Sequence, residues 1–447
     1  MEVVRKCERC SNSLPAERLR HANSRFCSEA GAYLQRKQTE KCAMLKLLRL
    51  SLVPLAILCV LVLRLLRGRV RIGILWTQRI GHLAGNVEVY LCERDAGIRP
   101  HSFDIWCAPG EPCNKQLLKM WGRVLHIDRT GFANIVFKLN RLFRGWQSIE
   151  IPSGNLDRDV NNLWERYAPH TGFTPKEEFL GKTGLQNMGI PDGAKWVCLI
   201  VRDSAYLPQL TYHSYRNSDI KAYRFAAEAL AERGYYVIRM GANVEKPMAA
   251  KYIVQGASIA HPNGAHIIDY ATNGMRSDFM DIYLAAKCAF MISNGTGLDA
   301  VSGVFRRPIC YVNYVPLEYL PTWGQRSLAI WKHHEKDGKR MTPAEIYASG
   351  AGKFMRADEF EEAGITLVDN TPAEIKAVVE EMVVCIEDYA ASRQAFWDTF
   401  PRSTSPYTGT PLHGKIRMRI GREFLKAYNA PLQAHEVSAD NLMSYYG

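Results

Sequence analysis

The chain has 447 residues, of which 47% are hydrophobic and 23% are charged, values that are ordinary for a globular protein of two or three domains. Its formal net charge of +12 is concentrated in residues 1–71, which contain fifteen Lys and Arg residues and five acidic ones. Because the remainder is nearly neutral and the basic segment flanks an apolar one, the charge favours an anionic membrane surface as a partner and argues against a nucleic acid.

The N-terminal leader is rich in cysteine. Cys7 and Cys10 have the Cys-x-x-Cys spacing that presents two thiolates to one zinc ion, and Cys27 follows in the sequence FCSEA. This arrangement resembles a small treble-clef zinc module, in which His21 or Cys42 would have to supply the fourth ligand. A structural zinc ion held by Cys7, Cys10 and Cys27 is one interpretation, and a degraded or disordered basic leader is the other.

An apolar segment at 43–68 follows the leader. Only fourteen uncharged residues separate Arg49 from Arg64, whereas a bilayer core needs roughly 20. The segment could just cross a membrane if Lys46 and these arginines extended to the headgroups, and Pro54 would then kink it. A spanning helix, a re-entrant or interfacial anchor and a buried core helix therefore all stay open.

From residue 70 onward the sequence alternates strand-like and helix-like segments. In this first half we expect strands at 70–76, 103–108 and 123–127 and helices at 87–97, 114–121 and 132–143. The segment RIGHLAGN at 79–86 is expected to be a glycine-containing loop after the first strand. Such alternation predicts a parallel sheet with helices on both faces.

A second alternation follows a polar junction at 168–193. Here we expect strands at 196–203, 235–241, 266–271, 288–292 and 309–313 and helices at 219–234, 278–287 and 371–383. The fold class is therefore α/β, with two Rossmann-like, doubly wound domains that face a cleft. Ligands of such folds bind in that cleft.

The sequence SNGTG, at 293–297, lies between an apolar strand and a short helix. Backbone N–H groups at the start of a helix favour phosphate, and the polar side chains could add donors. The alternative is a turn whose glycines only satisfy backbone angles. The candidate ligand-binding residues of this loop are Ser293, Asn294, Gly295, Thr296 and Gly297.

Three arginines favour the phosphate interpretation. Arg202 and Arg239 each end a predicted strand, and Arg216 lies in the long polar loop after the first of these strands. Arginines at the carboxyl edge of a sheet project into the ligand cleft and can bind a diphosphate through two nitrogens. Together with the glycine-containing loop, they predict a diphosphate site.

His82 is the candidate catalytic residue of the first half. It lies in the RIGHLAGN segment, between Gly81 and Gly85, and could act as a general base or bind phosphate or an acceptor. A structural histidine is the alternative. Glu88, Asp95 and Asp104 are weaker candidates for a general base, because carboxylates on exposed helix faces are usually only solvated.

Several long blocks resemble a family of bacterial glycosyltransferases found in surface-polysaccharide biosynthesis loci. These blocks include VRIGILWTQRIGHLAGN, GYYVIRMG and DFMDIYLAAKCAFMISNGTGLDAV, and the resemblance covers about residues 69–430. It implies the GT-B architecture, with two Rossmann-like domains around a cleft.

A weaker resemblance, in IVRDS, YYVIRMG and DIYLAAKCAFMISNGTG, is to GDP-fucose-dependent fucosyltransferases. It implies that Arg202 contacts the diphosphate and that the segment from Ser293 to Thr296 is the phosphate loop. VRDS here replaces the VRRTD-like block of those enzymes, and NGT replaces their serine pair, so that the identity of the donor stays open.

These observations predict a membrane-associated glycosyltransferase at the cytoplasmic face of the inner membrane. It would use a GDP- or UDP-linked sugar and a lipid-linked glycan acceptor, with no catalytic metal, because arginines and helix dipoles stabilise the leaving diphosphate. The expected domains are a leader at 1–42, a membrane-associated helix at 43–68, an acceptor domain at 69–185, a nucleotide-sugar domain at 190–400 and C-terminal return helices at 401–447.

Two alternatives stay open. A nucleotide-sugar epimerase can share the two-domain fold, but it would need no acceptor and no membrane anchor. A zinc-bearing membrane adaptor could keep an inactive transferase fold; its function would then depend on Cys7 and Cys10 and would survive loss of Arg202 or His82.

Overall fold

The computed structural model describes residues 51–428 except 153–157, 206–208, 210, 249–252, 255–266, 325, 388–396, 403–415, 417 and 427. The cysteine leader and the proposed zinc ligands Cys7, Cys10 and Cys27 lie outside these described residues.

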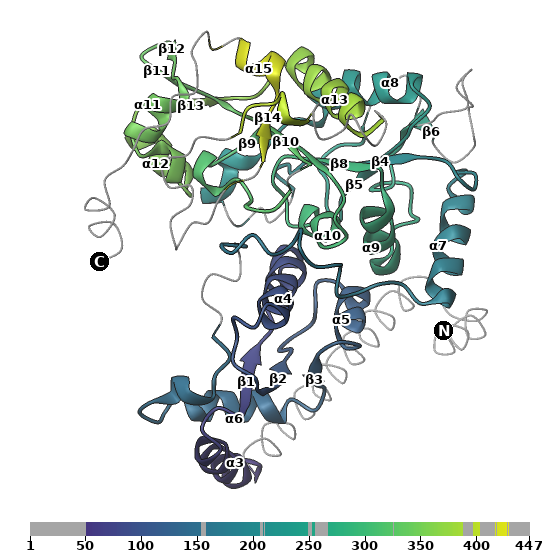
Figure 1. Cartoon of the computed structure of the whole chain (residues 1–447). Coiled ribbons are helices and arrows are strands. Elements are labelled where there is room, and N and C mark those ends of the chain that lie inside the picture. The colour runs from purple at the N-terminus through teal and green to yellow at the C-terminus, as the bar shows by residue number, and fades with distance from the viewer. Residues whose placement is uncertain are drawn as a thin grey trace, which may run out of the picture.

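The N-terminal unit is a small parallel sheet with helices on both faces (Figure 1). Its elements are α3 (Val53–Leu65), β1 (Val70–Ile74), α4 (Ile80–Asp95), β2 (Phe103–Cys107), α5 (Lys115–Trp121), β3 (His126–Asp128) and α6 (Phe132–Asn140). The strands follow the order β1-β2-β3, and Glu150 forms a parallel bridge with Ile72 on the free side of β1. Apolar residues of α4 and α5 pack in one core cluster, and those of α3 and α6 pack in another.

The C-terminal unit is built on an eight-stranded sheet in the order β14-β10-β9-β8-β4-β5-β7-β6, whose neighbouring strands all pair in parallel. Its strands are β4 (Trp196–Ile200), β5 (Tyr236–Met240), β6 (Ile253–Val254), β7 (Ile267–Ile268), β8 (Phe290–Ser293), β9 (Ile309–Tyr314), β10 (Leu328–Trp331) and β14 (Arg419–Ile420). Its helices are α7 (Pro175–Asn187), α8 (Arg224–Glu232), α9 (Asp278–Lys287), α10 (Asp299–Val304), α13 (Pro372–Glu387) and α15 (Arg422–Lys426).

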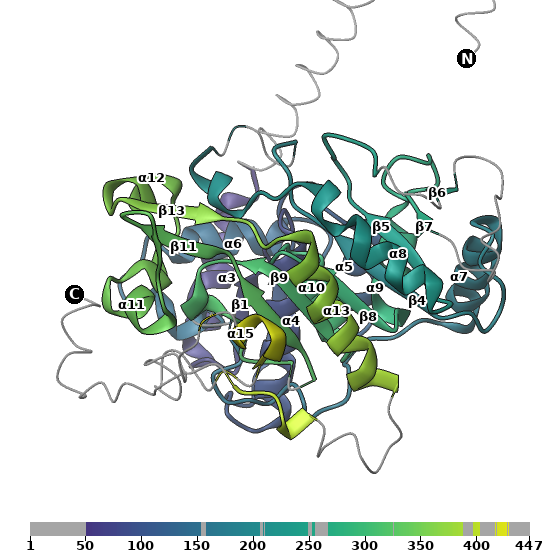
Figure 2. The ribbon, with the colours of Figure 1, turned by 90° about the horizontal axis from the view of Figure 1, so that it is seen from above.

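Both faces of this sheet are buried. Val197 and Leu199 of β4 belong to the core under α8 and α13, whereas Cys198 and Ile200 belong to the core under α9 and α10. This split follows from the alternation of side chains along a strand. Viewed from above in Figure 2, α8 and α13 lie over the near face of the sheet. The expectation of an α/β fold with parallel sheets is confirmed.

The core under α9 and α10 extends into the N-terminal unit. It contains Leu83 and Val87 of α4 together with Val301 and Val304 of α10, so the two sheets share one apolar cluster. Figure 1 shows α10 between the large sheet and α4. The two units are therefore packed together through helices and not only joined by a linker.

Besides the strands β6, β10 and β14 of the large sheet, two parts of the fold were not predicted. A three-stranded antiparallel sheet, with order β12-β11-β13, lies beside α11 and α12. Its elements are β11 (His333–Lys336), β12 (Lys339–Arg340), α11 (Pro343–Ala348), α12 (Ala357–Glu362) and β13 (Ile365–Val368). Helix α7 lies within the polar junction, and a capping box between Thr174 and Glu177 starts it. The sequence Thr-Pro-Lys-Glu carries the signature of this cap.

The loop expected at 79–86 is wrong, because α4 begins at Ile80 and includes Gly81, His82 and Gly85. Glycine disfavours an isolated helix by about 1 kcal/mol. Here the glycines face α10 and its preceding loop, where a larger side chain would not fit next to Gly81. Tertiary packing therefore outweighs the local preference.

No helix in the described part of the chain is both long and apolar enough to cross a membrane. Of the apolar segment expected at 43–68, the structure describes α3, which packs Ala56 and Val60 against α6. Pro54 lies in the first turn of α3, where proline is tolerated, and so does not kink it. Arg64 donates to the Arg144 carbonyl at 2.5 Å and thereby faces the protein.

Candidate functional site

A cavity of about 510 Å³ lies between the two units. The start of α4 lines one side, and the segments after β4, β8 and β9 line the other. In the large sheet β4 lies between β8 and β5, and the chain runs from β4 to β5 on one side and returns to β8 on the other. The cavity therefore lies at the carboxyl edge, beside the point where strand order reverses, which is where open α/β sheets bind ligands.

The loop after β8 is held together by two buried side chains. The Ser293 hydroxyl donates to Asp299 at 2.7 Å and accepts the N–H groups of Gly295 and Thr296 at 3.1 and 3.2 Å. Asn294 accepts the Arg202 N–H at 2.9 Å. Through these bonds Ser293 and Asn294 fix the conformation of the loop, and neither residue lines the cavity.

Three other residues of the loop, Gly295, Thr296 and Gly297, do line the cavity. The Thr296 hydroxyl is buried and has no hydrogen-bond partner among the described residues. Helix α10 after the loop has only six residues, and two of the loop N–H groups already bond to Ser293. The expected cradle of free backbone N–H groups is thus smaller than the sequence suggested.

The glycines of this loop are needed for packing against the N-terminal unit. A Cβ atom on Gly297 would lie 2.8 Å from the backbone nitrogen of Gly81, and one on Gly81 would lie 3.0 Å from Gly297 Cα. Real Cβ atoms essentially never approach a neighbour closer than 3.0 Å, so a side chain on Gly297 would force the backbone of α4 to shift. These glycines therefore let the backbone of α4, in the other unit, approach the loop closely.

Two of the predicted arginines line the cavity. Arg216 donates to the Gly295 carbonyl and keeps its Nε buried without a partner among the described residues. Arg202 donates to Asn217 at 3.3 Å. Two further arginines, Arg79 and Arg158, also line the cavity. Neither was predicted, because Arg79 lies in the segment expected to be a loop and Arg158 follows no strand that the sequence predicts.

The structure does not bring the third predicted arginine to the cavity. Arg239 is fully buried and pairs with Asp269 at 3.2 Å, while Asp203 lies 4.0 Å away. The Asp269 carboxylate also accepts the Met248 N–H at 2.8 Å. Arg239 therefore ties the carboxyl ends of β5 and β7 together beneath the surface.

Two histidines lie at the cavity. His82, in the first turn of α4, lies 3.4 Å from Asn86 Oδ1 through Nδ1, and its ring packs at a tilt against that of Trp76. His213, which was not predicted, has a buried Nδ1 without a partner among the described residues. Burial and the nearby Arg216 and other arginines lower the pKa of His213. The unprotonated imidazole is the form that this positive environment favours.

Among the described residues that line the cavity, Asp299 is the only acidic one. It is buried beneath the loop, and this burial raises its pKa to about 7 although Ser293 donates to it. The cavity thus presents arginines with little opposing negative charge, which is chemistry suited to a polyanionic ligand.

No protein-family model matches the chain, and no curated protein matches its sequence. Among solved structures, it is similar to a family 9 glycosyl transferase from Veillonella parvula, with 9% identity and a TM-score of 0.42 over 71% of this chain and 98% of that one. It is also similar to the E. coli ADP-heptose LPS heptosyltransferase II, with 11% identity and a TM-score of 0.40 over 71% of this chain and 100% of that one.

A UDP-GlcNAc 2-epimerase from Neisseria meningitidis, solved with UDP-GlcNAc, matches with 11% identity and a TM-score of 0.24 over 69% of this chain and 81% of that one. TM-scores this low assign neither a fold family nor an activity on their own.

Proposed function

We propose that the chain is a glycosyltransferase of the GT-B type that binds a nucleotide-sugar in the cavity between its two units. The observation that carries this proposal is the set of arginines around a cavity at the strand-order reversal of a parallel sheet. Guanidinium groups bind diphosphate oxygens through charge-assisted hydrogen bonds. The arginines concerned are Arg79, Arg158, Arg202 and Arg216.

In this proposal the arginines also serve the chemical step. Negative charge develops on the diphosphate as the sugar leaves, and fixed positive groups stabilise that charge without reorganisation. The loop from Gly295 to Gly297 would face the phosphates, and the buried hydroxyl of Thr296 would gain a partner there. His82 of α4, on the opposite wall, would accept the proton of the attacking acceptor hydroxyl. No step requires a catalytic metal ion.

The acceptor would be a lipid-linked glycan at the cytoplasmic face of the membrane. Helix α3 supports this placement, because the face opposite Ala56 and Val60 exposes large apolar side chains. Leu58 and Leu65, for example, are 57% and 81% exposed. Exposed apolar patches mark interaction surfaces, and the basic residues of the leader and of positions 67 and 69 suit anionic lipids.

Thermal shift of the full chain tests donor binding. We expect UDP, GDP or ADP to raise the melting temperature, and inorganic pyrophosphate to raise it less, because it lacks the nucleoside. CMP, which has one phosphate, is the comparison for the diphosphate requirement. If no nucleoside diphosphate stabilises the folded protein, the proposal fails.

A nucleotide-sugar epimerase is the rival enzyme. It would convert or hydrolyse a UDP-sugar without an acceptor, so product analysis in the absence of membranes separates the two reactions. The adaptor alternative predicts that Arg202→Ala and His82→Ala leave glycan synthesis in cells intact; loss of the glycan with either folded variant excludes it.

A further inference from the structure

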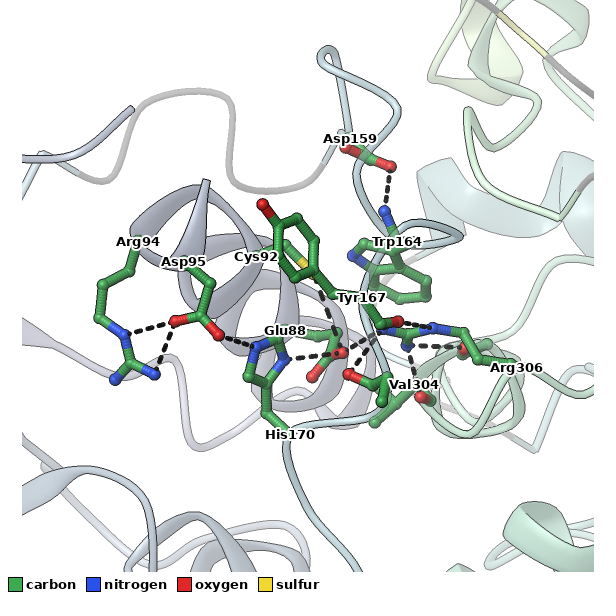
Figure 3. A network of polar contacts seen from close by, with 12 residues as sticks. Glu88, Cys92, Arg94, Asp95, Asp159, Trp164, Tyr167, His170, Val304 and Arg306 are labelled. Carbon is green, nitrogen blue, oxygen red and sulfur yellow. Dashed lines mark hydrogen bonds and ion pairs between the residues drawn. The ribbon is translucent and has the colours of Figure 1, made fainter. Parts of the chain in front are cut away.

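Behind the cavity, α4 and the segment before α7 bring three metal-ligating residues together. Glu88 and Cys92 lie one turn apart on α4, and His170 approaches them from the junction (Figure 3). One ligand atom from each residue lies within 4.8 Å of the other two, an arrangement that no other His, Cys, Asp or Glu group of the described chain provides. Glu88 Oε1 lies 3.1 Å from His170 Nδ1 and 3.9 Å from Cys92 Sγ.

A second carboxylate orients the histidine. Asp95 Oδ2 lies 3.0 Å from His170 Nε2, so the imidazole is held with Nδ1 directed at Glu88. Metal-binding histidines commonly have such a carboxylate on the other ring nitrogen, because it fixes the ring and raises the basicity of the ligand. The cluster therefore has an outer partner in addition to the ligands.

The Glu88 carboxylate is only half satisfied. Oε1 accepts from Arg306 at 2.5 Å, whereas Oε2 is buried and has no hydrogen-bond partner among the described residues. The side chain is 0% exposed. In Figure 3 the carboxylate lies between His170 on one side and Arg306 on the other. Arg306 balances the charge of the carboxylate but leaves Oε2 without a donor in the described part of the chain, and a buried carboxylate oxygen without a hydrogen bond is unfavourable.

We propose that Glu88, Cys92 and His170 bind a divalent transition-metal ion. Mixed carboxylate, thiolate and imidazole ligands suit Zn²⁺, which takes such a set in tetrahedral geometry with a fourth position for water. Binding replaces one proton on the Cys92 thiol and one on His170 by the two charges of the ion, so the net charge of the buried cluster is unchanged. The distances between the three ligand atoms, all within 4.8 Å, would need to shorten by less than about 1.5 Å to reach those around a tetrahedral zinc ion.

The ion would join three parts of the molecule. Two ligands come from α4 of the N-terminal unit and the third from the junction, while Arg306, in the turn after α10, contacts the Glu88 carboxylate from the C-terminal unit. The site is thus structural, and it holds the two units in their relative position behind the cavity. It is independent of the proposed transferase activity and would persist if that proposal failed.

Cobalt titration of the full chain tests the site. The leader cysteines are first replaced (Cys7→Ser, Cys10→Ser, Cys27→Ser and Cys42→Ser), so that they cannot bind the ion. We expect this background to bind one Co²⁺ per chain, with thiolate-to-cobalt charge-transfer absorption, and Zn²⁺ to displace it.

Added to this background, Cys92→Ser should abolish the charge-transfer band, and Asp95→Asn should weaken binding about 10- to 100-fold. Cys113→Ser is the matched control, because Cys113 is an exposed thiol outside the cluster. Circular dichroism checks that each variant is folded. Absence of Co²⁺ binding in the folded background, or a charge-transfer band that survives Cys92→Ser, would overturn the proposal.

Discussion

Gly81 of α4 and Gly297 of the loop after β8 meet backbone to backbone, so that a Cβ atom on Gly297 would lie 2.8 Å from the Gly81 nitrogen. The two residues belong to different units and lie more than 200 residues apart in the sequence, yet their contact brings the helix of His82 against the loop of Thr296. The geometry of the cavity depends on this contact, and it leads to the first prediction.

Gly297→Ala should lower the free energy of unfolding by about 1–3 kcal/mol, because the new methyl group collides with a main-chain nitrogen and not with a movable side chain. Urea denaturation measures the change. Gly172→Ala is the control, since nothing lies within 4 Å of a Cβ atom there. Equal effects of the two substitutions would contradict the packing argument.

Arg202→Ala and Arg216→Ala should each weaken binding of the stabilising nucleoside diphosphate about tenfold to a hundredfold. The reason is that a hydrogen bond to a charged group contributes about 1.5–3 kcal/mol. Isothermal titration calorimetry gives the dissociation constants. Arg166→Ala removes an exposed arginine outside the cavity and should leave the affinity unchanged. If neither Arg202→Ala nor Arg216→Ala weakens the affinity for the nucleoside diphosphate, the ligand binds outside this cavity.

Arg239→Ala should act on stability instead. Removing the guanidinium leaves the Asp269 carboxylate buried without its ion pair, which destabilises proteins by about 3–5 kcal/mol. Chemical denaturation of the variant measures this loss. The nucleotide affinity of the fraction that stays folded should match that of the unaltered protein. A loss of affinity in folded protein would instead show that Arg239 contacts the ligand.

Nucleotide binding should strengthen as pH falls below about 6.5, the ordinary pKa of histidine. Burial and the arginines lower the pKa of His213 in the free protein, and a bound diphosphate would offset their charge and raise it. Binding then takes up a proton, so the affinity rises as protons become available. Calorimetry across this pH range in the unaltered protein and in His213→Gln tests the effect, which the substitution should remove.

Leu58→Glu combined with Leu65→Glu should reduce co-flotation of the full chain with anionic vesicles by tenfold or more. Each buried leucine contributes roughly 1.5–3 kcal/mol, and the new carboxylates repel the surface. Leu180→Glu is the matched control, because Leu180 of α7 is 45% exposed and lies outside α3. If the α3 variant floats with vesicles as well as the unaltered protein, α3 does not contact the membrane.

The sequence predicted β9, β8, β4, β5 and β7 of the large sheet, because strands buried on both faces are continuous apolar runs, as in the segment from Trp196 to Ile200. It missed β6, β10 and β14 of the same sheet. It failed at Gly81 and Gly85, where helix formation depends on a partner helix more than 200 residues away in the chain. It also could not separate Arg202 from Arg239. Both end a strand, but Arg239 faces Asp269, a residue that only the three-dimensional fold brings near.

The site residues divide in the same way. Thr296 and Arg216 could be found from their position after a strand, whereas Arg158 lies in an irregular segment whose direction no periodicity fixes. His213 shares the 3-10 helix Thr211–Arg216 with Arg216, and nothing in the sequence pattern shows that it faces the cavity. Glu88 and Asp95 were set aside as solvated carboxylates of an exposed helix. Their helix is instead packed on both the junction and α10, and Glu88 is completely buried.

The apolar cluster that joins α4 to α9 and α10 has a consequence for how the molecule can be divided. Excised alone, the N-terminal half would expose the side of α4 that carries Leu83 and Val87, and the C-terminal half would lose the cover of Val301. Neither half is therefore a self-sufficient folding unit. A chimera that exchanges one half for that of another protein must therefore keep the facing residues of α4 and α10 matched to each other.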